Sequence, residues 1–189
     1  MYNYLAHHGV KGQKWGVRRY QNPDGTHTPL GRSRDRARDR KRYSSDDKVF
    51  ISGKVSYDKE LDDALKEEVD KIIKAKSEIL IGDAPGADTR VQEYLAKKGY
   101  SKIKVFTTDK KVRNTVGKWK VEKISSNGET EERLIRRQKD IAMTERSTRG
   151  LAIMPDDDRP DSAMSLNVKR LTDSGLRVRR YDYNKRKWS

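Results

Sequence analysis

The sequence lacks cysteine, and its histidines are confined to one end. Without cysteine the chain can form no disulfide bond, no thiolate nucleophile and no thiolate metal site. All three histidines (His7, His8 and His27) precede residue 28, which disfavours Ser-His hydrolysis in the rest of the chain. Adjacent histidines point in different directions, and no carboxylate cluster lies near His27. We therefore predict no metal site and no cofactor.

Long apolar runs are missing as well. Only 32% of the residues are hydrophobic and 39% are charged, and no run approaches the roughly 20 apolar residues that span a membrane. The N-terminus also lacks the apolar core of a signal peptide, because His7 directly follows Leu5 and Ala6. We therefore expect no membrane partner and a protein that acts inside a cell.

Positive charge, in contrast, is in excess. The 44 basic and 29 acidic side chains give a formal net charge of +15, and 11 of the basic residues lie within residues 1–47. This surplus favours a polyanionic partner such as nucleic acid, although charge alone is weak evidence. Residues 32–42 alternate Arg with Ser, Asp and Ala, so they form either a solvated linker or an extended basic helix.

Apolar residues form short strand-like runs, and segments with helical spacing of apolar residues lie between these runs. Runs typical of buried strands lie at 48–52, 78–81, 103–106, 150–154 and 176–181. Helical spacing is found between them, over 61–73, 91–97, 131–144 and 162–174. Strict alternation of strand and helix predicts an α/β fold, a Rossmann-like three-layer sandwich with a mainly parallel sheet. Residues 107–130 fit neither period and form a site-covering loop or a hairpin.

These patterns divide the chain into four parts. We expect a poorly ordered basic N-terminal segment (1–31), a basic linker (32–47), the α/β domain (48–183) and a basic tail (184–189). The tail mixes basic residues with Trp188, so it serves either to solubilise the protein or to bind nucleic acid.

The loop Gly82-Asp83-Ala84-Pro85-Gly86-Ala87-Asp88 leads from a predicted strand into a helix. Its small residues allow a phosphate or sugar to approach the backbone, and N–H groups at the start of a helix favour anionic oxygen. Asp88 either caps the helix or holds a ribose hydroxyl. Asp83 points into the site or at a neighbouring backbone N–H. Without a ligand, the same loop is a tight turn with an aspartate cap.

A parallel sheet binds ligands beyond the carboxyl ends of its strands, which adds residues from elsewhere in the chain. Arg113 can reach over a ligand, whereas Arg137 and Asp140 share a helix face and either serve the site or pair with each other. The run of three aspartates from Asp156 is more typical of a solvated turn than of a Mg²⁺ site. The predicted ligand-binding residues are Ser52, Gly53, Lys54, Gly82, Asp83, Ala84, Gly86, Ala87, Asp88, Arg113, Asn114, Arg137 and Asp156.

Residues 8–25, HGVKGQKWGVRRYQNPDG, resemble a short module that recurs in proteins of tailed phages and prophages. Basic residues surround Trp15 and Tyr20 in this module, a mixture that suits either nucleic acid or docking on a partner protein. The resemblance implies a phage origin and association with the virion or its assembly. We therefore expect the protein in the cytoplasm of a bacterial host cell or on the virion.

The domain at 48–183 resembles the SLOG superfamily of Rossmann-like domains. The resemblance rests on Gly53, on the loop GDAPGAD at 82–88, and on Ile141-Ala142-Met143 ahead of the run 150–154. This superfamily includes sensors of nucleotide derivatives, nucleotide-cleaving LOG enzymes and the DNA-processing protein DprA. Lys54 replaces an arginine found in many relatives. Asp83 favours sugar hydroxyls over a second phosphate. Many relatives are oligomers, so we also consider a homo-oligomer.

Three functions follow from these observations. The first is the binding of a nucleotide or nucleotide-derived ligand, by a sensor or a sequestering protein. The second is an enzyme that cleaves the N-glycosidic bond of a nucleotide derivative, with Asp88 and Asp140 as its catalytic carboxylates. The third is DprA-like nucleic-acid binding through the basic surfaces.

Overall fold

The computed structural model describes residues 22, 26, 28–33, 43–109, 111–126 and 128–189. The chain divides into two units, Met1–Arg42 and Tyr43–Ser189. In the first unit, the backbone N–H of Asn22 donates a hydrogen bond to the carbonyl of Thr26 (2.7 Å), and residues 29–33 form a short helical turn. The phage-like segment before Asn22 and most of the basic linker lie outside the described residues.

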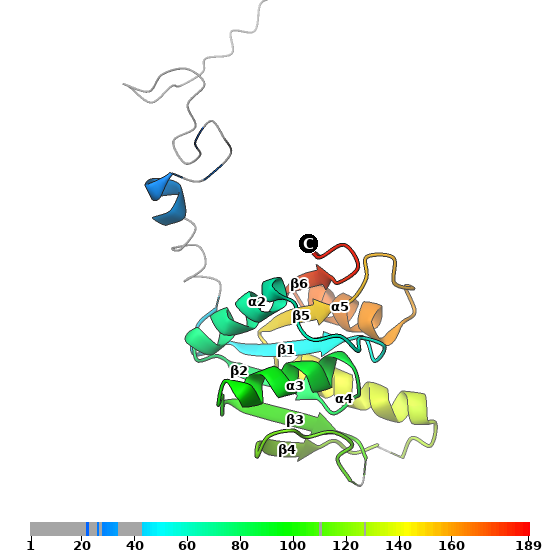
Figure 1. Cartoon of the computed structure of the whole chain (residues 1–189). Coiled ribbons are helices and arrows are strands. Elements are labelled where there is room, and N and C mark those ends of the chain that lie inside the picture. Colours follow the sequence, from blue (N-terminus) through cyan, green and yellow to red (C-terminus); the bar gives the residue numbers. More distant parts are fainter. Residues whose placement is uncertain (1–21, 23–25, 27, 34–42, 110, 127) are drawn as a thin grey trace, which may run out of the picture. The chain divides into compact units, whose positions relative to one another are not determined.

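The second unit contains one seven-stranded sheet (Figure 1). Its strands are β1 (Lys48–Gly53), β2 (Glu78–Gly82), β3 (Ile103–Thr107), β4 (Lys120–Lys123), β5 (Arg149–Ile153), β6 (Arg177–Asp182) and β7 (Lys187–Trp188). They lie in the order β4-β3-β2-β1-β5-β6-β7, and only the β6–β7 pair is antiparallel. The predicted α/β fold with a mainly parallel sheet is confirmed.

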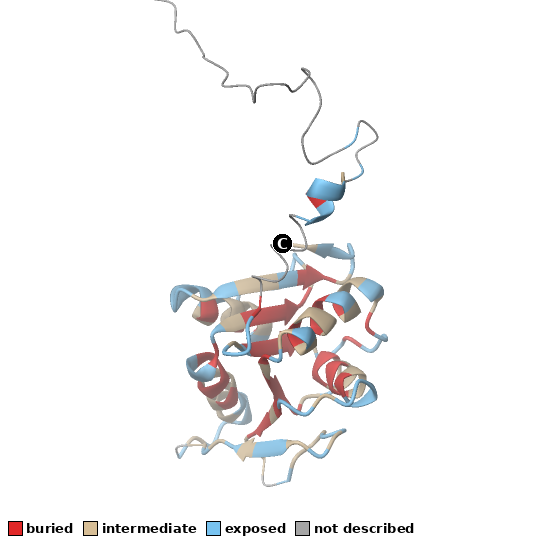
Figure 2. Cartoon of the chain, turned by 90° about the vertical axis from the view of Figure 1, so that its left-hand side faces the viewer, coloured by how far each residue is buried: buried red, intermediate tan, exposed pale blue. Residues whose placement is uncertain are grey.

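Two helices cover each face of this sheet (Figure 1). The first pair is α2 (Asp63–Lys74) and α3 (Ala87–Lys97), and the second pair is α4 (Glu132–Arg146) and α5 (Ala163–Asp173). Because successive strand residues point to opposite faces, Val49 and Ile51 pack with α2 and α3, whereas Phe50 packs with Met143 and Leu171. Figure 2 shows the buried strands between the two helical layers.

Helix α2 begins later than the sequence pattern indicated. Its N-cap is Asp62, whose Oδ1 accepts a hydrogen bond from the backbone N–H of Leu65 (3.0 Å). The helical spacing began at residue 61, two residues earlier. Asp62 satisfies one of the N–H groups that lack a partner within the first helical turn, so it fixes the boundary.

Residues 107–130 contain a strand as well as a loop. Thr107 ends β3, the chain returns along the sheet with no helix among residues 108–109 and 111–119, and β4 then pairs with β3 in parallel. The hairpin is therefore wrong, because a hairpin joins antiparallel strands. Trp119 secures this connection, because its Nε1–H donates a hydrogen bond to the carbonyl of Tyr100 (2.9 Å).

The basic tail contains the last strand of the sheet. Trp188 in β7 pairs with Tyr181 in β6, and their ring centroids are 4.7 Å apart. Arg179 lies over the Trp188 ring (4.2 Å) and also forms an ion pair with the buried Glu68 (2.7 Å). These contacts make Arg179 and Trp188 part of the folded domain.

The strand order determines where the chain leaves room for a ligand. From the central β1 the chain moves outward through β2, β3 and β4, then returns to β5 on the other side of β1. The connections at the carboxyl ends of β1 and β5 therefore diverge, and crevices at such switch points are the usual ligand sites of open α/β sheets.

Candidate functional site

A cavity of about 330 Å³ lies at the carboxyl ends of β1 and β2, against α4 and α5. We call it the main cavity. Its wall contains apolar side chains (Phe50, Ile51, Val55, Met143, Met164 and Leu166). Charged side chains make up much of the rest: Asp88, Arg113, Glu132, Arg133, Arg136, Arg137, Lys139, Asp140, Asp161 and Arg170. A second cavity of about 370 Å³ adjoins it near Lys54 and the start of α5.

The structure brings some of the predicted site residues together and leaves others apart. Those in the wall of the main cavity are Ser52, Gly53, Ala84, Asp88, Arg113, Arg137 and Asp140. Lys54 lines the second cavity. The predicted residues that line neither of these cavities are Gly82, Asp83, Gly86, Ala87, Asn114 and Asp156.

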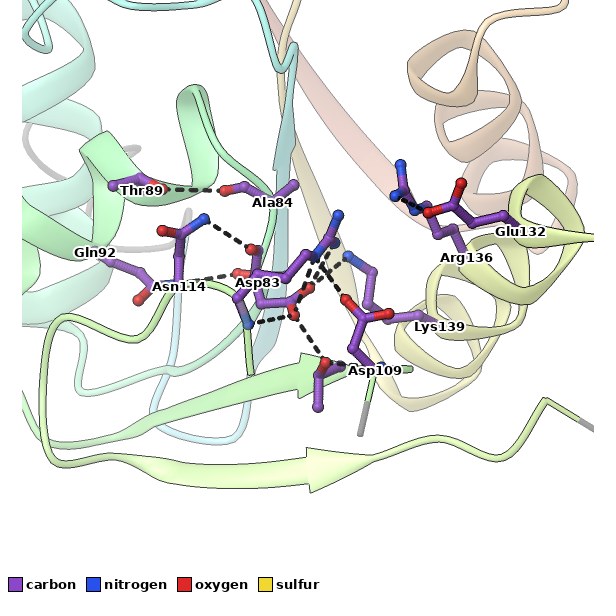
Figure 3. Close-up of polar contacts among 12 residues, drawn as sticks. Asp83, Ala84, Thr89, Gln92, Asp109, Asn114, Glu132, Arg136 and Lys139 are labelled. Atoms are coloured by element: carbon purple, nitrogen blue, oxygen red, sulfur yellow. Dashed lines mark hydrogen bonds and ion pairs between the residues drawn. The ribbon is translucent and has the colours of Figure 1, made fainter. Parts of the chain in front are cut away.

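Asp83 is enclosed by partners from three parts of the domain (Figure 3). Its side chain is fully buried, and its carboxylate accepts hydrogen bonds from Thr107 Oγ1 (2.8 Å) and from the Arg113 guanidinium (2.8 Å). Lys139 Nζ lies 3.6 Å away. Burial alone would raise the pKa of Asp83, but these partners lower it to about 2. Asp83 is thus an ionised anchor for the residue 108–119 connection.

Backbone N–H groups of the 82–88 loop also form hydrogen bonds within the domain. The N–H of Ala87 donates to the carbonyl of Lys54 (3.1 Å), and the N–H of Ala84 donates to the Asp88 carboxylate. Gly86 has φ of 82°, and a Cβ there would lie 2.3 Å from the carbonyl oxygen of Val55. The glycine therefore lets residues 54–55 pack directly on the loop. Two amides that could have bound a phosphate already have partners.

Two acids, the buried Asp88 and the partly exposed Asp140, lie beside Lys139. Burial raises the pKa of Asp88 to about 7, and Asp140 adds to this increase, while Lys139 opposes it. Burial also raises the pKa of Asp140, against the opposing effects of Lys139 and of a hydrogen bond from Asn167 Nδ2 (3.1 Å). With a pKa of about 7, the Asp88 carboxyl group can carry a proton near neutral pH.

The cationic wall of the main cavity comes from α4 and α5. Arg136 forms an ion pair with Glu132, as Figure 3 shows. Arg137 does not pair with Asp140, and in the part of the chain that the structure describes its guanidinium has no hydrogen bond or ion pair. Arg170 donates a hydrogen bond to Asn167 Oδ1 (2.6 Å). Burial lowers the pKa of Arg170, and repulsion from Arg137 contributes to this effect.

Sequence analysis missed Lys139 and Arg170 in this site. Lys139 is only 6% exposed and lies three and four residues before Ala142 and Met143, on the buried stripe of α4. A lysine on an apolar helical stripe was the available signal. Arg170 carried no such signal, because the local sequence did not show that this part of α5 borders the cavity.

Two of the aspartates after β5, Asp156 and Asp158, each interact with partners of their own. Asp156 pairs with Lys185 (3.1 Å), and Asp158 pairs with Lys54 and with the Ser162 hydroxyl. No group of three metal-ligating side chains is found among the described residues. Within the same residues, no helix has the length and apolar character needed to cross a membrane.

Fold and site together define a Rossmann-like α/β domain with a charged cavity at its switch point. Residues 1–22 match a family of unknown function, DUF7211. This match covers only the N-terminal segment and does not reach the domain. No curated protein and no solved structure matches the chain. The resemblances to the phage module and to the SLOG superfamily stay predictions.

Proposed function

We propose that the α/β domain binds a nucleotide or a nucleotide-derived ligand in the main cavity. The observation that carries this proposal is the pair Arg137 and Arg170. Both guanidinium groups line the cavity and repel each other, and neither forms an ion pair within the described residues, although the charge of Asp140 partly offsets the repulsion at Arg170. An arginine pair of this kind is stabilised when a phosphate lies between the two groups, because the fork of each guanidinium matches phosphate oxygens.

The remainder of the cavity suits a nucleoside. Met143, Leu166 and Phe50 provide an apolar wall for a base, and the carboxyl groups of Asp88 and Asp140 provide acceptors for sugar hydroxyls or base N–H groups. A volume of about 330 Å³ lies within the usual range for small-ligand sites. The anion-binding groups in this proposal come from α4 and α5 rather than from the amides of the 82–88 loop.

A second candidate function is cleavage of the N-glycosidic bond of the bound nucleotide. The raised pKa of Asp88, about 7, favours this chemistry because a carboxyl group that is protonated near neutral pH can act as a general acid. In this mechanism Asp88 would protonate the leaving base, Asp140 would stabilise the positive charge that develops on the sugar, and a water molecule would add to the anomeric carbon and return its proton to Asp88.

The test is a thermal-shift titration of the full chain with the four ribonucleoside 5′-monophosphates and the four 5′-diphosphates. We expect at least one nucleotide to raise the melting temperature in a concentration-dependent way. Arg137→Ala should weaken the binding of this nucleotide about tenfold. Arg177→Ala removes an exposed arginine at the start of β6 and should leave the affinity unchanged.

The same samples separate binding from catalysis. Free base that accumulates with the wild type and not with Asp88→Asn would establish the enzyme. An unchanged nucleotide would establish a binding protein. If none of the eight nucleotides shifts the melting temperature, the proposed function is wrong.

A further inference from the structure

The two cavities share much of their wall. The residues common to both are Gly53, Val55, Arg133, Asp161, Ala163 and Met164. The main cavity continues from this shared wall toward Asp88 and Arg170, and the second cavity continues toward Lys54 and Arg159. A molecule in the main cavity therefore has the second cavity next to it.

The second cavity carries cationic groups of its own. Lys54 is paired with Asp158, whereas the Arg159 guanidinium has no hydrogen bond or ion pair to any residue of the described ranges. Arg133 lines both cavities, and among the described residues its guanidinium makes one hydrogen bond, from Nη2 to the Asp161 carbonyl (3.5 Å). Ala163 and Met164 open α5, and the first N–H groups of a helix favour an anion.

The two cavities are lined by different kinds of side chain. Apolar side chains and buried carboxyl groups are found in the main cavity, as a base and a sugar require. In the second cavity, the polar lining consists of Lys54, Arg133, Arg159, Asp161 and Ser162. Lys54 is neutralised by Asp158, and the two remaining cations, Arg133 and Arg159, outnumber the one carboxylate, Asp161, so the second cavity suits a compact anion better than a second nucleoside.

We propose that the natural ligand is a nucleotide with a diphosphate, whose nucleoside and first phosphate occupy the main cavity and whose second phosphate occupies the second cavity. This inference rests on the proposed function and specifies its ligand class. Arg133 lies between the two phosphates and contacts both, and Arg159 binds only the second. The far phosphate is either free, as in a nucleoside diphosphate, or joined to another unit.

The experiment measures dissociation constants of the full chain by isothermal titration calorimetry for three probes. These are the best-binding nucleoside monophosphate, its diphosphate, and the dinucleoside diphosphate of the same base. We expect the diphosphate to bind about tenfold more tightly than the monophosphate, because it gains charge-assisted hydrogen bonds in the second cavity. In Arg159→Ala this ratio should fall to near one. In the control Arg177→Ala it should stay near ten.

Each outcome decides a different claim. Equal affinities for monophosphate and diphosphate, or the same ratio in Arg159→Ala as in the wild type, would overturn the diphosphate inference and leave nucleotide binding in place. A failure of all three probes to bind would remove the proposed function as well. Tight binding of the dinucleoside diphosphate supports the inference with a substituted far phosphate, and binding of the simple diphosphate alone supports it with a free one.

Discussion

Two aspartates of one loop, five residues apart, have opposite surroundings. Asp83 is enclosed by Arg113, Thr107 and Lys139, and the pKa of Asp83 is lowered to about 2. Asp88 is almost as deeply buried, yet burial raises the pKa of Asp88 to about 7. The difference comes from hydrogen-bond donors, because the carboxylate of Asp83 receives several and Asp88 lacks a comparable set.

This comparison separates a structural carboxylate from a candidate functional one. Asp83 uses its charge to hold the helix-free connection between β3 and β4, so its negative charge is neutralised inside the fold. Asp88 instead borders the main cavity, and its carboxyl group can gain or lose a proton near neutral pH. Burial alone would not have distinguished them, whereas the partners of each group do.

The largest expected effect comes from removing the Asp83 carboxylate. Asp83→Ala leaves Arg113 and Lys139 partly or fully buried without this counter-charge, so we expect a loss of about 3–5 kcal/mol in the free energy of unfolding. Urea denaturation followed by circular dichroism measures this loss. As a control, Asp156→Ala breaks the exposed pair with Lys185 and should change stability far less. Equal losses in the two variants would contradict the anchor role of Asp83.

A smaller effect is expected from the titration of Asp88. Because the pKa of Asp88 is about 7 in the folded state and near 3.8 in the unfolded state, the unfolded chain releases this proton first as pH rises. Asp88 therefore lowers stability progressively from about pH 4 to pH 7, by a few kcal/mol, and has no further effect above that range. Asp83 acts in the opposite direction, since it adds stability as pH rises from about 2 to 4.

Urea denaturation of the wild type and Asp88→Asn between pH 4 and 8 checks this prediction. The stability of the wild type should fall relative to that of the variant across pH 4–7, and the two curves should run parallel above pH 7. Because Asp140 raises the pKa of Asp88, the two acids are coupled, and the difference between the curves reports the loss of Asp88 together with its effect on Asp140. Parallel curves over the whole range would show that Asp88 is not protonated in the folded protein.

The smallest effect is expected at Gly82, which lies between the two aspartates and Lys139. A Cβ at this position would lie 2.5 Å from Asp88 Oδ2 and 2.6 Å from Lys139 Nζ. Gly82→Ala should displace these side-chain ends, destabilise the protein by about 1–3 kcal/mol and weaken nucleotide binding. Gly99→Ala is not a suitable control, because Gly99 has positive φ. Ala96→Ser, at an exposed position in α3, tests for a general effect of substitution near this element.

Much of the fold followed from local pattern. Short apolar runs gave the five longer strands that pair in parallel within the sheet, and helical spacing gave the four helices that cover it. Strand β4 was missed because only Val121 in it is apolar and its residues are mostly exposed. Strand β7 is two residues long, so it depends on pairing with β6 rather than on its own composition.

The site was less predictable, because its residues come from segments far apart in the sequence. The 82–88 loop suggested a ligand-binding turn, and Ala84 and Asp88 do border the main cavity. The sequence did not indicate that Arg113 would bind Asp83, or that Val55 would cover Gly86. Such contacts depend on tertiary packing, and for the same reason the sequence did not indicate that Arg170 on α5 borders the cavity.

The strand order also has a consequence for how the chain folds during synthesis. Val49 in β1 pairs on one side with Ile79 and on the other with Arg149, one hundred residues later. One edge of the most deeply buried strand therefore stays open until β5 has left the ribosome, and open apolar edges promote pairing with other chains. Early release of a chain that ends within α4 would leave both this edge and half of the cavity wall incomplete, so truncation there should produce aggregation rather than a partly active domain.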